Sequence, residues 1–286
     1  MMSLGLVSSL AFFGGGIFGR NLALKGINSD NALKNHQKLL VWLLFAIAPL
    51  IAILIILDKY HLASLLPKIF PSTLLIYLAG YFNELIVGFG CFFLGLLLFL
   101  ELTGKRSRQR IIQLLLAMGA ITFALSILLF FLQPVNALVN QPKIVDGVVF
   151  QTTPYTCAPS SIATLARYIK KHPRLSEREA VELTQTNRFG TTTLSEIRAM
   201  KKLNLNPEYH HNLTPKDLIT FGKPALLHVK EKRKKGKGAR FSHAVAFFVA
   251  DAEEEVILIG NPLFGVQLKT FEELKEYWFG EAILIN

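Results

Sequence analysis

The stretch from Phe150 to Ile169, FQTTPYTCAPSSIATLARYI, decides how the second half of the chain is interpreted. It starts as a polar loop and continues with an amphipathic pattern, which predicts a helix from residue 158 to about 170. Cys157 directly precedes this helix, where the helix dipole favours a thiolate. Gln151 lies six residues earlier, so its side-chain amide and the Cys157 N–H could donate two hydrogen bonds to a developing oxyanion. The stretch therefore predicts a nucleophile.

A thiolate nucleophile needs a base, and the base needs a group that orients it. His243 begins the apolar strand HAVAFFVA, and Asn261 closes the next predicted strand, EVILIG, at the turn to Pro262. Adjacent antiparallel strands can bring two such side chains to the same end of a sheet. The sequence therefore predicts that Asn261 accepts a hydrogen bond from the imidazole of His243 and fixes its tautomer.

Short elements follow one another from about residue 141 onward. Helices are predicted first, and antiparallel strands follow them, which is typical of the α+β class. The predicted elements are a strand at 147–150, helices at 158–170, 176–184 and 193–202, strands at 224–230, 243–250 and 255–260, a helix at 270–279 and a strand at 281–285. The basic run KEKRKKGKGAR at 230–240 predicts a solvated hairpin tip, with contact to lipid headgroups as the alternative.

The four residues Gln151, Cys157, His243 and Asn261, in this order and setting, resemble a papain-type cysteine peptidase. More closely, residues 141–286 resemble the double-glycine leader peptidases, family 39 of the cysteine peptidases. FGTTTLSEIRAMKKLNL (189–205), HAVAFF and GNPLFG resemble the family's Gly-Thr-Ser segment, His-led strand and Asp-Pro turn. The chain departs from the family in having Ala158 where a glycine is usual and Asn261 where an aspartate is usual.

This resemblance implies a papain-like fold and a thiol protease of the kind that processes bacteriocin and peptide leaders. It implies Cys157, His243 and Asn261 as the catalytic triad, Gln151 as the oxyanion donor, and no metal or organic cofactor. The implied substrate is a peptide or protein segment with small residues, typically two glycines, before the scissile bond. The alternative is a catalytically inactive peptidase-like domain that acts as a leader-peptide receptor or export adaptor. Intact Cys157 favours the enzyme, whereas the neutral Asn261 keeps the alternative open.

The first half of the chain has a different composition. Of all 286 residues, 51% are hydrophobic and only 18% are charged, and the apolar residues gather before residue 140. Four apolar runs, at about 2–19, 39–57, 73–100 and 111–132, approach or exceed the length of a membrane-spanning helix. The sequence therefore predicts a multi-pass α-helical membrane domain over 1–140, in contact with the lipid bilayer, and an α+β papain-like domain over 141–286.

Positive residues cluster after the first and third apolar runs, which predicts that those loops are cytoplasmic. In this arrangement the chain lies in the cell membrane, and the peptidase domain is extracytoplasmic. Glu84 is an acid within the third run, and it suggests a further hypothesis in which the spans form a transport or sensing module that the domain regulates.

Other functions are disfavoured by the sequence. The net charge of +11 is not gathered with aromatic residues on one basic face, so nucleic acid is not an expected partner. Cys91 and Cys157 lie in different halves, so no disulfide is expected. A phosphate-binding GxxxxGK[ST] loop is absent from the sequence, so any ATP-driven exporter would be a separate partner. His228, like His210 and His211, shows no metal-binding spacing and is predicted to be a structural or surface residue.

Overall fold

The computed structural model describes residues 4–27, 87–100, scattered positions from 112 to 127, and 129–286 apart from 235–236. For residues 233–239 it does not describe the side chains. The chain divides into two compact units. One of them ends at Leu132, and the other contains all residues from Gln133 to Asn286.

The first unit contains helix α1 (Leu4–Leu24) and a helix over 87–100. Their backbones touch, because a Cβ atom at Gly15 would collide with the carbonyl oxygen of Phe92, and one at Gly95 with that of Phe12. Glycine at both positions therefore allows this contact.

The predicted multi-pass membrane region is wrong for the part of the chain that the structure describes. None of the helices there is both long enough and apolar enough to cross a membrane. The run predicted at 2–19 continues as α1 into Arg20 and Asn21, which lower its hydropathy. The runs at 39–57 and most of 73–100 lie outside the described residues, and 111–132 is described only in part. The predicted sidedness depends on those runs and stays a prediction, and Glu84 also lies outside the described residues.

The second unit contains five α-helices among its described residues, and several begin at a side-chain cap. The Ser176 hydroxyl accepts from the Glu179 N–H at the start of α8, and Thr270 does the same for Glu273 at the start of α11. Such caps satisfy N–H groups that the helix leaves free and set where each helix begins. The helices are α7 (Cys157–Tyr168), α8 (Glu177–Thr184), α9 (Thr193–Lys202), α10 (Pro215–Phe221) and α11 (Phe271–Tyr277).

The strands form one antiparallel six-stranded sheet and a separate two-stranded one. The large sheet has the order β3-β8-β4-β5-β6-β7, in which β4 and β5 form the central hairpin. Its strands are β3 (Pro207–His210), β4 (Ala225–Lys234), β5 (Lys237–Asp251), β6 (Val256–Asn261), β7 (Gly265–Thr270) and β8 (Trp278–Ile285). The small sheet pairs β1 (Ile144–Val145) with β2 (Val148–Val149).

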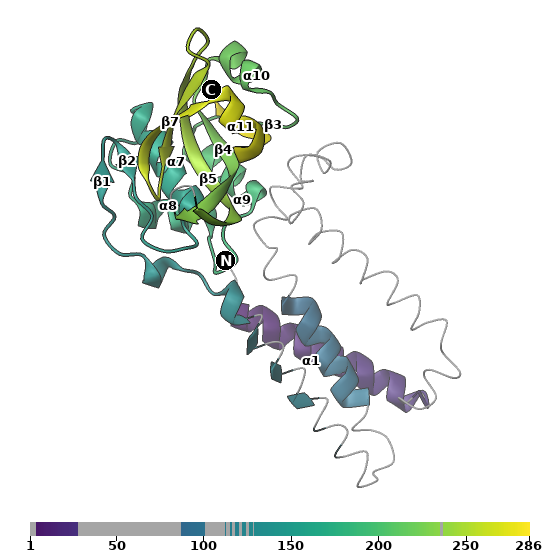
Figure 1. Cartoon of the computed structure of the whole chain (residues 1–286). Coiled ribbons are helices and arrows are strands. Elements are labelled where there is room, and N and C mark those ends of the chain that lie inside the picture. Colours follow the sequence, from purple (N-terminus) through teal and green to yellow (C-terminus); the bar gives the residue numbers. More distant parts are fainter. Residues whose placement is uncertain are drawn as a thin grey trace. The chain divides into compact units, whose positions relative to one another are not determined.

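Helices cover both faces of the large sheet (Figure 1). On one face, side chains of α7, α8 and α9 pack on Leu226, Ala246 and Ile283. On the other face, Leu218 of α10 and Leu274 of α11 share a core with strand residues that alternate with the first set. This alternation gives β4 and β5 two different chemical faces.

Candidate active site

Cys157 is the first residue of α7, which begins one residue before the predicted start at 158. The start of this helix is fixed to the central strand β5, because the Ser161 hydroxyl donates to the carbonyl oxygen of Ala244 at 3.0 Å. The Thr164 hydroxyl accepts from the Val149 N–H at 3.0 Å and ties the same helix to β2. The thiol of Cys157 is thus held beside the residue that follows His243 in the chain.

His243 lies on β5 opposite Val229 of β4, and its side chain is almost fully buried. Strand β6 pairs with β5 only from Ala246 onward, so Asn261 at the end of β6 reaches past the paired region. The His243 Nε2 and Asn261 Oδ1 atoms lie 3.1 Å apart. The structure therefore brings together the two residues that the sequence pairs.

The tautomer of His243 follows from the partners of Asn261. The Asn261 Oδ1 atom also accepts from the Leu263 N–H at 2.9 Å, and the Asn261 Nδ2 group donates to a carboxylate oxygen of Glu231 at 2.7 Å. Because Oδ1 only accepts, Nε2 of His243 carries the proton. The Nδ1 atom of His243 is buried and has no hydrogen-bond partner among the described residues. It is therefore free to take a proton.

Gln151 lies on the loop that leads into α7, next to the turn that carries Asn261. Its backbone N–H donates to the Pro262 carbonyl at 3.0 Å. Its side-chain Nε2 donates to the Thr153 carbonyl at 2.7 Å, which uses one of the two N–H bonds of that amide. Among the described residues, no hydrogen bond joins Gln151 to Cys157 or Cys157 to His243.

Burial determines the proton positions of the resting site. Burial raises the pKa of the Cys157 thiol to about 11, while hydrogen bonds from the Ala244 backbone and the start of α7 lower it and the charge of Glu196 raises it. Burial lowers the pKa of His243 to about 4, against the opposing effects of Asn261 and Glu231. The helix start thus favours the thiolate as expected, but desolvation outweighs it. The resting pair is a neutral thiol and a neutral imidazole.

A second buried histidine, His228 on β4, lies between two carboxylates. Its Nε2 is 2.8 Å from an oxygen of Glu196 on α9, and its Nδ1 is 3.1 Å from an oxygen of Glu281 on β8. Burial alone would lower the pKa of His228, but the charges and hydrogen bonds of Glu196 and Glu281 raise it to about 10. His228 is therefore an imidazolium held in a buried ion cluster, which agrees with the predicted structural role.

Glu231 is the residue of the site that the sequence reading missed. It is the single acid in the basic run at 230–240, which was predicted to be a solvated tip. Strand β4 instead continues to Lys234, and Glu231 is buried. The two-residue alternation from Leu227 through Val229 to Glu231 was the available signal, because it places all three on one face of a strand.

Comparison with known proteins finds no matching family model and no matching curated protein. Solved structures do match, and they cover about half of this chain. The first is a double glycine motif protease from an AMS/PCAT transporter in complex with the leader peptide, at 19% identity, covering 51% of this chain and 95% of that one, with a TM-score of 0.41.

The second is the peptidase domain of Streptococcus ComA, a bifunctional ABC transporter involved in a quorum sensing pathway, at 24% identity, 51% and 98% coverage, and a TM-score of 0.39. The third is the peptidase domain of Streptococcus mutans ComA, at 25% identity, 49% and 98% coverage, and a TM-score of 0.36. The solved structures to which this chain is similar are thus a double glycine motif protease from a transporter and two peptidase domains of ComA.

Proposed function

We propose that this chain is a cysteine peptidase that cleaves peptide or protein segments, with Cys157 as nucleophile and His243 as base and acid. The observation that carries the proposal is the His243 Nε2 to Asn261 Oδ1 hydrogen bond, which leaves a buried Nδ1 free to accept a proton. A base held in one tautomer by a neighbouring amide is what a thiol nucleophile needs.

The proposed reaction starts from the neutral pair. When substrate brings the thiol and Nδ1 of His243 into contact, the proton passes to Nδ1 as the sulfur of Cys157 attacks the peptide carbonyl. The N–H of Cys157 and the second N–H of the Gln151 amide stabilise the oxyanion. The imidazolium then gives its proton to the leaving amine, and water hydrolyses the thioester.

The proposed substrate class comes from the resemblance and from the neighbours. One matched structure is a protease in complex with a leader peptide, and the matched domains belong to transporters. We therefore propose a leader-like peptide ending in small residues such as two glycines, and a separate exporter as a possible partner.

A second candidate function is a receptor that binds such peptides without cutting them. The observation that favours it is the raised pKa of Cys157, about 11, beside a His243 whose pKa is lowered to about 4. A site that never transfers the proton would keep its thiol unreactive.

Alkylation of Cys157 separates the two functions without a known substrate. The experiment uses the full chain with Cys91→Ala, which leaves Cys157 as its single thiol, and compares it with the same chain carrying His243→Ala. Because the resting thiol and imidazole are both neutral, the peptidase predicts that His243 takes up the thiol proton as Cys157 attacks the reagent, so that alkylation near pH 7 slows when His243 is replaced. It also predicts that His243→Ala and Cys157→Ala lower cleavage of a Gly-Gly leader peptide by at least roughly 10³-fold. If the alkylation rate of Cys157 is the same with and without His243→Ala, the receptor function is established instead.

A further inference from the structure

We propose that Glu231, together with Tyr277, is a positioning residue of the catalytic site that fixes the Asn261 amide and supplies the negative charge that asparagine lacks. The inference rests on the proposed peptidase function. It concerns a residue outside the triad, reached through Asn261 and not through substrate.

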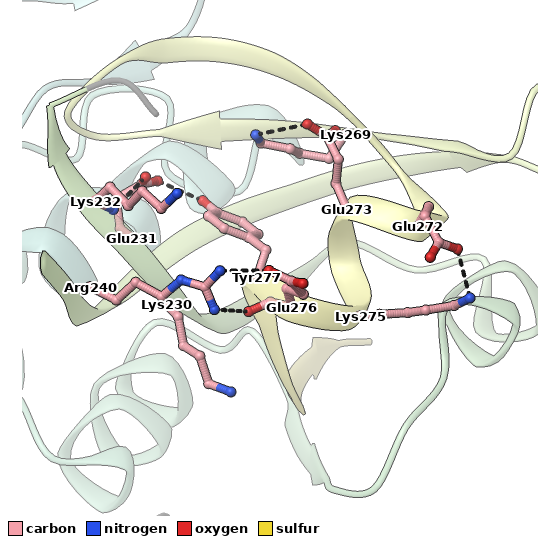
Figure 2. A pocket seen from close by; sticks show the side chains of 10 residues that line it. All are labelled: Lys230, Glu231, Lys232, Arg240, Lys269, Glu272, Glu273, Lys275, Glu276 and Tyr277. Atoms are coloured by element: carbon pink, nitrogen blue, oxygen red, sulfur yellow. Dashed lines mark hydrogen bonds and ion pairs between the residues drawn. The ribbon is translucent and has the colours of Figure 1, made fainter. Parts of the chain in front are cut away.

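The carboxylate of Glu231 is held from three sides. Its Oε2 atom accepts from Asn261 Nδ2 at 2.7 Å and from the Tyr277 hydroxyl at 2.8 Å, and its Oε1 atom accepts from the backbone N–H of Lys232 at 2.9 Å. Figure 2 shows the Tyr277 ring directed from α11 toward Glu231 on β4. Burial and the charge of Glu231 raise the pKa of Tyr277, which keeps its hydroxyl protonated as a donor. Both oxygens of Glu231 therefore act as acceptors.

These contacts leave one orientation for the Asn261 amide. The Nδ2 group donates to Glu231 and also to Gln267 Oε1 at 3.2 Å, while Oδ1 accepts from Leu263 N–H and faces His243 Nε2. A flipped amide would put its oxygen against the Glu231 carboxylate, which only accepts, and its N–H₂ group against the Leu263 N–H, which only donates. Glu231 thus fixes which end of Asn261 faces His243, and so fixes the free Nδ1 of that histidine.

The negative charge of Glu231 lies one amide away from the imidazole. This charge favours protonated His243, against the burial that disfavours it. The imidazolium forms only when Cys157 loses its proton, so the carboxylate stabilises the charge that develops during attack. A carboxylate that directly contacts histidine does the same in other triads. Here Asn261 relays the effect.

Six of the other charged side chains around Glu231 form three ion pairs. Glu231 and Tyr277 border a cavity of about 440 Å³ between β4, β5, β7 and α11 (Figure 2). Its ion pairs are Arg240 with Glu276, Lys269 with Glu273 and Lys275 with Glu272.

The remaining cations that line this cavity are Lys230, which lies over the ring of Phe279 at 5.0 Å, and Lys232. Among these acids, Glu231 is the one that the structure bonds to Asn261. Its neighbour Glu276 is bonded to Arg240 at the surface and serves as a matched control.

A charge exchange tests the role of Glu231 in the full chain. Glu231→Gln removes the charge and turns an acceptor into a group that can also donate, so we expect kcat to fall about 10- to 100-fold with KM little changed. Asn261→Asp places two carboxylates in hydrogen-bond contact, so one of them must take up a proton, and we expect a similar fall.

The double variant, Glu231→Gln with Asn261→Asp, exchanges the amide and the carboxylate. Glutamine can then donate to aspartate, which accepts from His243, and we expect kcat to recover to within about tenfold of the wild type. Tyr277→Phe removes one donor and keeps the ring, so we expect a fall of only a few-fold. Glu276→Gln leaves kcat unchanged. Unfolding curves of every variant separate lost activity from lost folding.

The outcomes separate this role from the proposed function. If Cys157 is alkylated at the same rate in the chain with His243 and in the His243→Ala variant, the proposed function is wrong. The role of Glu231 is then wrong as well. If the wild type depends on His243 but Glu231→Gln keeps its kcat and its pH profile, this role alone is wrong. A double variant no better than Asn261→Asp would also overturn it.

Discussion

Two buried histidines on neighbouring strands of one sheet have opposite electrostatics. His228 lies opposite Ala244, and Val229 lies opposite His243, so the two occupy adjacent rows of the β4–β5 hairpin. The pKa of His228 is raised to about 10, and that of His243 is lowered to about 4. Both are desolvated, so burial does not explain the difference. His228 contacts two carboxylates, whereas His243 contacts the oxygen of an amide.

The partners decide what each histidine can do. An imidazolium between two carboxylates is a fixed charge that connects α9, β4 and β8, and it cannot act as a base at neutral pH. A neutral imidazole with one bonded and one free nitrogen can accept a proton. The strand alternation makes this separation possible, because adjacent residues of β4 and β5 face different cores. The sheet thus keeps its structural charge on one side and its candidate base on the other.

The largest expected effect comes from removing the charge of His228. His228→Gln leaves Glu196 and Glu281 buried without their cation, and breaking a buried ion pair in this way costs about 3–5 kcal/mol of unfolding free energy. This loss of unfolding free energy is measured by urea unfolding followed by Trp278 fluorescence, in a Trp42→Phe background. Trp278 is a suitable probe because its indole N–H donates to the Glu281 carbonyl. The matched control is His210→Gln, since His210 pairs with Glu208 at 3.8 Å on the surface and should cost less than about 1 kcal/mol. Equal losses in both variants would show that the cluster is not stabilising.

The pH dependence of stability follows from the sign of the His228 shift. The unfolded pKa is about 6.5 and the folded pKa is about 10, so the folded state holds the proton more tightly. The contribution of His228 is complete below about pH 6.5 and is lost as the pH rises toward 10, at up to about 1.4 kcal/mol per pH unit. Unfolding free energies at pH 6.5, 8 and 9.5 should decline in the wild type and decline less in His228→Gln. Parallel curves would mean that His228 is neutral in the folded chain.

Several local elements and the pairing of His243 with Asn261 were predictable from the sequence, but the electrostatics were not. The helices at Glu177–Thr184 and Thr193–Lys202 match the predicted ones closely because periodicity and capping residues are local signals. The pairing of His243 with Asn261 was predicted and is present. Glu231 was missed because its burial depends on α11, which lies some forty residues later in the chain. The opposite shifts of His228 and His243 depend on contacts between distant elements, which no local pattern encodes.

The smallest expected effect tests whether the two histidine sites are electrically coupled. The charge of Glu196, a partner of His228, also raises the pKa of Cys157. Glu196→Gln should therefore lower that pKa and speed alkylation of Cys157 at a fixed pH, by less than about tenfold. The measurement uses the Cys91→Ala, His243→Ala background, in which the thiol ionises without its base. Glu281→Gln is the matched control, because Glu281 belongs to the same cluster but does not shift the Cys157 pKa. An equal change in both variants would mean that the pKa of Cys157 responds to the charge of His228. It would then not depend on the distance between Cys157 and Glu196.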